Sequence, residues 1–183
     1  MSDGFALFVR QFFRKPGEVR SLVPSSRALG LRATEPLSRA TGLVVELGPG
    51  TGTITRCILE RGVPPGRLVL MEMNPAFCTA LGREFPGVRV VNAAAQTLDR
   101  LPLPEAPGAV VSGVPILAMP APVQHAIMAA AFSRLKPGAP FLQLTYGLRP
   151  PEVLEDLGLT WRRMGRVWRN IPPAEVYCFT RAA

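Results

Sequence analysis

The chain has 183 residues, of which 48% are hydrophobic, a length that suits one compact domain with a substantial core and excludes a second large one. The excess of 21 basic over 13 acidic residues, concentrated near the N-terminus, favours an anionic partner, either nucleic acid or an anionic membrane surface. The three cysteines follow no metal-ligand or disulfide spacing, and no apolar run is long enough to span a bilayer, so we expect no metal and only peripheral membrane contact.

Residues 1–16 are predicted to form a short amphipathic helix that starts after Ser2 or Asp3 and ends at Pro16. Aromatic side chains cluster on one face of the helical wheel and cations flank it, which is typical of a helix that lies in a membrane interface. The membrane-binding residues expected here are Phe5, Phe8, Val9, Arg10, Phe12, Phe13, Arg14 and Lys15. The alternative is that the phenylalanines pack against the protein itself.

Apolar runs alternate with helix-like stretches from residue 41 onward. Strands are expected at 42–47, 67–71, 88–91, 109–113 and 139–146, and helices at 53–61, 75–85 and 122–135. This alternation predicts an α/β fold with a mainly parallel, doubly wound sheet covered by helices on both faces. The proline-rich stretch 101–108 is expected to be a surface loop, and residues 160–170 and 175–181 are expected to form a hairpin at the sheet edge.

A glycine-rich segment, Glu46-Leu47-Gly48-Pro49-Gly50-Thr51-Gly52, follows the first strand, and Thr51 or Thr53 is the expected cap of the next helix. Glycines let a ligand approach the backbone closely. The GxGxG spacing differs from the GxGxxG of dinucleotide-binding loops, and Glu46 would repel a pyrophosphate but attract a cation. The segment therefore points to S-adenosylmethionine, which carries an ammonium and a sulfonium, with a simple strand-to-helix turn as the alternative.

Further cofactor contacts are expected where the second and third strands end. Glu72 can accept hydrogen bonds from both ribose hydroxyls of the adenosine, or it is an ordinary acid before a helix. Asn92 can meet the adenine amino group, or it caps its loop. The cofactor-binding residues predicted in all are Glu46, Gly48, Gly50, Thr51, Gly52, Glu72, Met73, Asn92, Ala93 and Ser112.

From Phe12 onward the chain resembles the bacterial phospholipid N-methyltransferases. The residues that carry the resemblance are Phe12-Phe13, Val23-Pro24-Ser25-Ser26, Glu46–Gly52, Glu72-Met73-Asn74, Ser112-Gly113-Val114-Pro115, Thr145-Tyr146-Gly147 and Val167-Trp168-Arg169-Asn170 with Pro172-Pro173. The resemblance implies a Rossmann-like class I methyltransferase with a seven-stranded sheet and an N-terminal amphipathic helix. It divides a single domain, 1–183, into a membrane-binding helix (1–16), a helical extension (17–40) and a catalytic core (41–183).

The activity implied by this resemblance is the stepwise methylation of phosphatidylethanolamine towards phosphatidylcholine with S-adenosylmethionine. It further implies a monomer bound to phosphatidylethanolamine and anionic lipids at the inner, cytoplasmic face of the plasma membrane, and it disfavours nucleic acid as a partner.

The acceptor amine is expected to be oriented by Tyr146, which would be the catalytic residue; a buried core tyrosine is the alternative. An arginine on the hairpin can pair with the lipid phosphate, and an aromatic residue can contact the headgroup. The substrate-binding residues predicted are Ser25, Ser26, Val114, Pro115, Tyr146, Arg166, Trp168 and Tyr177. His125 lies on a predicted helix away from these strand ends, which disfavours a catalytic role.

Two other functions fit parts of the pattern. Ribosomal RNA adenine dimethyltransferases share the glycine-rich segment, and the +8 charge suits them. Enzymes that modify a base usually carry an Asn/Asp-Pro-Pro-aromatic segment after the fourth strand, whereas Ser112-Gly113-Val114-Pro115 has neither the amide nor the aromatic residue. A non-catalytic module that binds the cofactor or a membrane is the third hypothesis.

Overall fold

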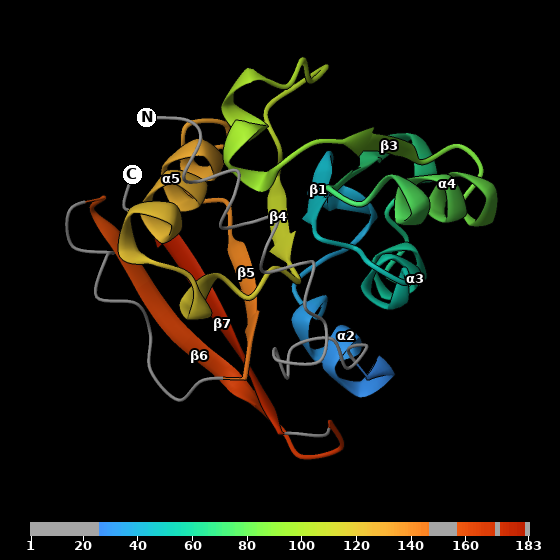
Figure 1. The fold of residues 1–183 in the computed structure, drawn as a ribbon. Coiled ribbons are helices and arrows are strands. Elements are labelled where there is room, and N and C mark those ends of the chain that lie inside the picture. Colours follow the sequence, from blue (N-terminus) through green and yellow to red (C-terminus); the bar gives the residue numbers. More distant parts are fainter. Residues whose placement is uncertain (1–25, 147–156, 171–172, 182–183) are drawn as a thin grey trace.

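The structure is a computed structural model that describes residues 26–146, 157–170 and 173–181 (Figure 1). The predicted membrane helix, residues 1–16, and the predicted substrate residue Ser25 lie outside the described residues. Within them, no helix is both long and apolar enough to cross a bilayer.

A seven-stranded sheet forms the centre of the described structure, with the order β3-β2-β1-β4-β5-β7-β6. Its strands are β1 (Val44–Leu47), β2 (Leu68–Glu72), β3 (Arg89–Asn92), β4 (Ala109–Ser112), β5 (Phe141–Thr145), β6 (Leu159–Val167) and β7 (Ala174–Arg181). The first five strands pair in parallel, and β7 pairs antiparallel with both β5 and β6. The predicted mainly parallel seven-stranded sheet, including its terminal hairpin at the edge, is therefore confirmed.

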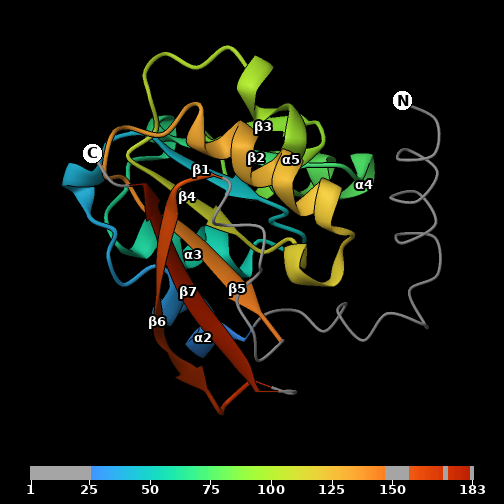
Figure 2. The same ribbon diagram turned by 90° about the vertical axis from the view of Figure 1, so that its left-hand side faces the viewer.

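Helices cover both faces of the sheet, as Figures 1 and 2 show. The α-helices are α2 (Arg27–Ala33), α3 (Thr53–Glu60), α4 (Pro75–Glu84) and α5 (Ala121–Phe132), and the 3-10 turns are η2 (Arg39–Thr41), η3 (Pro65–Arg67), η4 (Ala95–Arg100) and η5 (Ile116–Ala118). Helix α5 and turn η4 lie on one face, called here the α5 face, and α2, α3 and α4 lie on the other, called here the α3 face. The described part of the predicted extension 17–40 contains α2.

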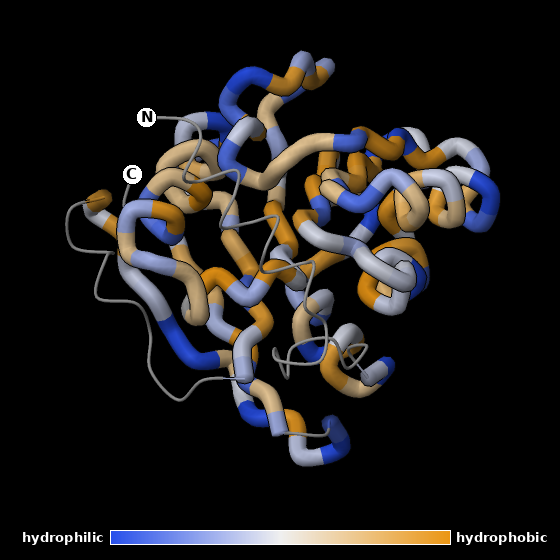
Figure 3. The backbone as a smooth tube through the Cα atoms, in the orientation of Figure 1, coloured by the Kyte–Doolittle hydropathy of each residue, from blue (hydrophilic) through white to orange (hydrophobic). Residues whose placement is uncertain are grey.

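Two apolar clusters, one on each face, hold these layers together. The cluster on the α5 face includes Val45, Phe141 and Phe179, and the cluster on the α3 face includes Val44 and Leu142. Neighbouring residues of a strand point to opposite faces, so each buried strand supplies both clusters. Figure 3 shows hydrophobic segments along the central strands, whereas β6 at the edge carries hydrophilic residues.

The predicted cap of helix α3 was wrong. The helix begins at Thr53, but its N-cap is Gly52, in the left-handed conformation with φ of 78° and no side-chain cap hydrogen bond. A Cβ atom on Gly52 would lie 2.6 Å from Cε2 of Phe85, at the end of α4. Close packing against α4 therefore selects a glycine as the N-cap, where the sequence favoured the hydroxyl of Thr51 or Thr53.

Candidate cofactor and acceptor site

The predicted cofactor residues meet at one edge of the sheet because β1, β2, β3 and β4 are parallel and their carboxyl ends are in register. Leu47 pairs with Met71 on one side and with Ser112 on the other, and Glu72 pairs with Asn92. Residues distant in sequence thus surround the glycine-rich loop 48–52. This is the edge at which ligands bind in open parallel sheets.

The glycine-rich loop packs tightly at one point and is open at another. The Gly48 N–H donates to the Met71 carbonyl at 2.9 Å, and a Cβ atom on Gly48 would lie 2.8 Å from Cγ2 of Val114. A Cβ atom on Gly50 would meet no described residue within 4 Å. The loop therefore leaves space beside Gly50, where a ligand can approach the backbone.

Glu72 lies at the centre of this edge and is buried. Its Oε2 accepts a hydrogen bond from the Gly50 N–H at 3.1 Å, and its Oε1 accepts one from the Asn74 N–H at 2.9 Å. Each carboxylate oxygen has a second lone pair, so each can still accept a hydrogen bond from a ligand hydroxyl. The position fits the two ribose hydroxyls, and the contact with Gly50 links Glu72 to the loop.

Glu46 lies beneath the loop on the α3 face and is fully buried. The Thr55 hydroxyl donates to its Oε2 at 2.7 Å, whereas Oε1 has no partner in the described part of the chain. Burial raises the pKa of Glu46 to about 8, and the charge of Glu72 adds to the rise, while the Thr55 hydrogen bond opposes it. A buried acceptor without a donor fits an ammonium ligand, reached directly or through water.

Asn92 ties the ends of β2 and β3 together. Its Nδ2 donates to the carbonyls of Glu72 and Met73, both at 2.9 Å, and the Ala93 N–H donates to the Glu72 carbonyl at 3.1 Å. The amide nitrogen thus caps the loop. The Met73 side chain is exposed beside this pair and presents an apolar surface suited to an adenine ring.

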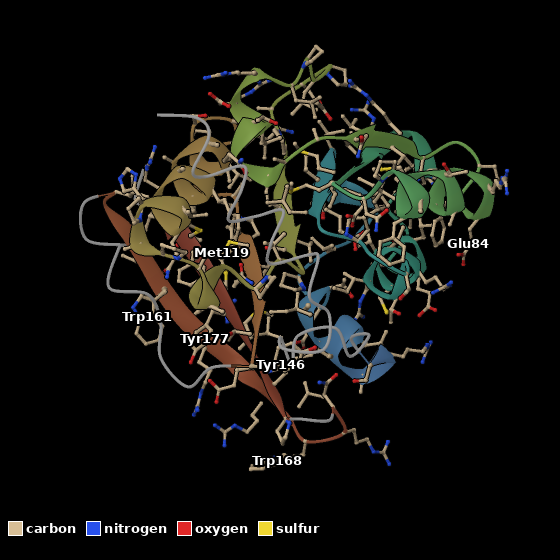
Figure 4. All side chains as sticks on the ribbon, in the orientation of Figure 1. Glu84, Met119, Tyr146, Trp161, Trp168 and Tyr177 are labelled. Carbon is tan, nitrogen blue, oxygen red and sulfur yellow. The ribbon has the colours of Figure 1, made fainter. Side chains whose placement is uncertain are left out.

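The predicted acceptor residues divide between the two faces of the sheet. Tyr146 directly follows β5 and packs against the cluster on the α3 face. Tyr177 belongs to the cluster on the α5 face, where Trp161 contacts its ring edge-on at 5.6 Å between centroids (Figure 4). The Arg166 guanidinium lies 5.1 Å from the ring centroid of Trp168, which is 71% exposed. The structure therefore brings Arg166 and Trp168 together but places Tyr146 and Tyr177 on opposite faces.

The other predicted substrate positions among the described residues, Ser26, Val114 and Pro115, lie at the start of α2 and in the loop after β4. The Ser26 hydroxyl accepts a hydrogen bond from the Leu29 N–H and caps α2, while the Ser26 N–H donates to Oδ1 of Asn170 at 2.8 Å. Val114 and Pro115 lie in the loop between β4 and η5, and Val114 closes over Gly48.

A buried carboxylate on β7, Glu175, was missed by the sequence analysis. The Tyr177 hydroxyl donates to Oε2 of Glu175 at 2.6 Å, and Arg166 Nε and Arg163 Nη1 donate to Oε1 at 3.0 and 3.3 Å. Burial and this hydrogen bond raise the pKa of Tyr177 to about 12, so the hydroxyl stays protonated as a donor. Gln143, a polar residue within the apolar strand β5, was also missed, and that interruption was the available signal.

No group of three or more histidine, cysteine, aspartate or glutamate side chains able to hold a metal occurs in the ranges that the structure describes.

Comparisons with known proteins place these features among methyltransferases, although no family model matches the chain. The chain is 29% identical to the ornithine lipid N-methyltransferase of Singulisphaera acidiphila, over 94% of each chain. It is 38% identical to the ribosomal RNA small subunit methyltransferase A of Myxococcus xanthus over 53% of its own length, and the match spans 31% of that protein.

Solved structures share the fold at low sequence identity. The 1,6-didemethyltoxoflavin-N1-methyltransferase of Burkholderia thailandensis, solved with S-adenosylhomocysteine, has a TM-score of 0.69 at 15% identity, covering 96% of this chain and 88% of that one. The precorrin-6y C5,15-methyltransferase of Geobacter metallireducens has a TM-score of 0.63 at 19% identity, covering 85% and 88%. The fold is that of the class I S-adenosylmethionine-dependent methyltransferases, and S-adenosyl-L-methionine is the cofactor that fits its loop.

Proposed function

We propose that this S-adenosylmethionine-dependent methyltransferase methylates the primary amine of phosphatidylethanolamine, and then its mono- and dimethyl derivatives, at a membrane surface. The observation that carries the proposal is the similarity to a lipid N-methyltransferase over 94% of both chains. The ribosomal RNA methyltransferases match over 39–53% of this chain and less than a third of their own length. The similarity to the lipid enzyme is thus long enough to include both the glycine-rich loop and the strands β5, β7 and β6.

The cofactor would be held by the residues around the glycine-rich loop. Glu72 would accept the ribose hydroxyls, the free Oε1 of Glu46 would accept the ammonium, and the backbone at Gly50 would border the ligand. When bound, S-adenosylmethionine supplies an electrophilic methyl group: the carbon–sulfur bond breaks as the amine nitrogen forms the new bond, and the electron pair leaves with sulfur.

The protein itself would align the acceptor nitrogen with the methyl group and assist deprotonation of the amine. The acceptor arrives as an ammonium and must lose a proton to the solvent before its lone pair can attack, so partial desolvation of the amine assists. The sequence suggests Tyr146 for orienting the nitrogen, but this residue packs on the α3 face of the sheet, so we assign the alignment to polar groups on the α5 face instead. Alignment alone supplies a large part of the rate enhancement in displacements of this kind.

The headgroup of ornithine lipid is the second candidate acceptor. It is favoured because the relative that matches over 94% of both chains is an ornithine lipid N-methyltransferase. An acylated ornithine carries a primary amine and a carboxylate, where phosphatidylethanolamine carries a primary amine and a phosphate. Both acceptors are therefore zwitterions with the same reacting group.

The loop after β4 argues against a flipped base as the acceptor. A Cβ atom on Gly113 would lie 2.9 Å from the Gly48 carbonyl oxygen, so the two loops leave no room there for a larger side chain. The segment Ser112–Pro115 offers neither a side-chain amide nor an aromatic face for a base. The positive charge that would suit RNA suits anionic lipid equally.

Membrane attachment is proposed through residues 1–16, at the inner face of the plasma membrane. Deletion of residues 1–15 is expected to weaken binding to anionic liposomes, and added salt is expected to weaken binding of the full chain by screening its cations. Equal binding by the shortened and full chains would refute this attachment.

The deciding experiment supplies labelled S-adenosylmethionine to the full chain with one of three acceptors: phosphatidylethanolamine vesicles, ornithine lipid vesicles or undermethylated ribosomal RNA. Label in the first acceptor supports the proposal, and label in the second alone supports the second candidate. Label in the RNA alone would overturn both.

A further inference from the structure

Four polar side chains cross the α5 face of the sheet where the core would otherwise be apolar. Register places Ser112 of β4 beside Gln143 of β5, Gln143 beside Tyr177 of β7, and Tyr177 beside Arg163 of β6. We call these four residues the polar row. Its Ser112 end adjoins Leu47, directly before the glycine-rich loop, and its Arg163 end lies on the edge strand. The row therefore runs from the cofactor side of the molecule to its surface.

The inner end of the row presents acceptors without donors. The side chains of Ser112 and Gln143 are 0% and 1% exposed, and Ser112 Oγ and Gln143 Oε1 have no hydrogen-bond partner among the described residues. The orientation of the Gln143 amide is fixed because its Nε2 donates to the carbonyls of Val114 and Leu144, at 2.8 and 2.5 Å. Buried acceptors of this kind are costly without a donor, which an amine would supply.

The outer end of the row is cationic. Glu175 is buried and lies within hydrogen-bond reach of both Arg163 and Arg166, so one carboxylate faces two guanidinium groups. Burial raises the pKa of Glu175, but the Tyr177 hydrogen bond and the charges of Arg166 and Arg163 outweigh it and leave the pKa lowered. Glu175 therefore stays ionised and positions the arginines, whose side chains are 59% (Arg163) and 30% (Arg166) exposed. The surplus positive charge is open to an anion.

The two ends are spaced for one small zwitterion. Gln143 and Arg163 are in register on strands separated by β7 alone, which corresponds to about 10 Å across the sheet, and Arg166 lies level with Thr145, two residues further along β5. The long side chains of Gln143 and the arginines shorten the gap that a ligand must bridge. An amine and an anion separated by a few bonds match this spacing, whereas a simple amine or a simple anion would satisfy one end only.

We propose that the polar row, with Arg166 and Glu175, is the headgroup site: the amine lies at Ser112 and Gln143, and the phosphate or carboxylate lies at Arg163 and Arg166. This inference rests on the proposed function and narrows the acceptors to zwitterionic amines. It makes Tyr177 a positioning residue that acts through Glu175. It also assigns the Ser112 hydroxyl to the acceptor, where the sequence assigned Ser112 to the cofactor.

Calorimetry on the full chain saturated with S-adenosylhomocysteine tests the site without turnover. The probes are O-phosphoethanolamine, which has both charges, N-acetylornithine, whose anion is a carboxylate, and ethanolamine, which lacks an anion. Wild type is expected to prefer the first or second over ethanolamine. Arg166→Ala is expected to bind the preferred zwitterion about tenfold more weakly and to lose the preference, since tenfold corresponds to ~1.4 kcal/mol. The matched control is Arg162→Ala, an exposed arginine of the same strand in register with Cys178, a residue of the α3-face cluster.

Ser112→Ala tests the inner end, and the loss of an unpartnered hydroxyl should leave the fold intact. This variant is expected to bind all three amines severalfold more weakly while its affinity for S-adenosylhomocysteine is unchanged. Equal zwitterion binding by wild type, Arg166→Ala and Arg162→Ala would overturn the inference, as would wild type that binds no zwitterion. Selective binding without methylation of any lipid would overturn the proposed function alone, and lipid methylation with no Arg166 dependence would overturn the inference alone.

Discussion

The two halves of the carboxyl edge differ in how they are built. The cofactor half consists of parallel strands whose functional groups lie at the carboxyl ends of the strands or in the loops directly after them, so Glu46 and Gly52 are six residues apart in the chain. The acceptor half depends on β5, β7 and β6, where antiparallel register brings Gln143 next to Tyr177 and Glu175 next to Arg166. A short segment can specify the first half. The second exists only after distant strands have paired, which leaves its composition freer to vary with the acceptor.

The largest effect expected in the cofactor half is structural and concerns Gly52. Gly52→Val would place a branched side chain at φ of 78° and within 2.6 Å of Phe85, and we expect the free energy of unfolding to fall by about 3 kcal/mol. Gly50→Ala is the matched control, with φ of 54° and open space, and should lose about 1 kcal/mol. Urea unfolding of both variants measures the difference, and equal losses would contradict the packing argument.

Loss of Glu72 should weaken binding of the cofactor but not binding of the headgroup. We expect Glu72→Ala to weaken S-adenosylmethionine binding about a hundredfold, since charged hydrogen bonds to the ligand and the support of Gly50 are both lost. Headgroup binding by the variant should stay within a few fold of wild type. The control is Glu84→Ala, which removes an exposed carboxylate paired with Arg56 at the far end of α4 (Figure 4). Calorimetry with each ligand checks the result, and unchanged cofactor affinity would refute the assignment.

Glu46 predicts a pH dependence of stability. Its pKa is about 8 in the folded protein, against an ordinary value of 4.5 for the exposed side chain of the unfolded chain, so the folded state holds the extra proton between these limits. Stability therefore falls as pH rises through this window, by about 2 kcal/mol between pH 6 and pH 8. Glu46→Gln should lose this part of the slope, because the other titrating groups are common to both proteins. Urea unfolding at a series of pH values measures it, and parallel profiles for the two proteins would show that Glu46 is ionised when buried.

The smallest effect is expected at Tyr177, on the acceptor side. Tyr177→Phe removes the hydroxyl that donates to Glu175, but both arginines still hold the carboxylate, so the free energy of unfolding should fall by about 1 kcal/mol. Headgroup affinity should fall with it, whereas cofactor affinity should not change. Thermal unfolding and calorimetry measure these effects, and an equal loss of cofactor affinity would show that the two halves are coupled through β5.

The sequence predicts the cofactor half better than the acceptor half. Alternating apolar runs gave the strands and helices to within a few residues, because parallel strands buried on both faces are short and rich in apolar residues. Glu46, the glycines and Glu72 could be placed because they lie at or directly after the carboxyl ends of strands that the sequence shows by itself.

The surroundings of Glu175, Gly52 and Asn92 could not be predicted without knowing which strands and helices are neighbours in space. Nothing local to Glu175 indicates that two arginines and a tyrosine surround it, since these contacts depend on the β6–β7 register and its irregularity between Arg163 and Gly165. Gly52 replaced the predicted threonine cap because α4, a separate element, packs against it. For Asn92 the sequence left open an adenine contact or a loop cap, and only the pairing of β2 with β3 shows its amide nitrogen donating to the carbonyls of Glu72 and Met73.

Strand β7 follows β6 in the chain but lies between β5 and β6 in the sheet. During synthesis on the ribosome, β6 therefore has no partner to pair with until β7 has emerged, and β5 remains an open edge for the same interval. Open edges invite pairing between chains, so this is the interval in which a nascent chain is most prone to aggregate or to need a chaperone. Folding of the acceptor half is thus tied to the emergence of β7, whereas the cofactor half can assemble earlier.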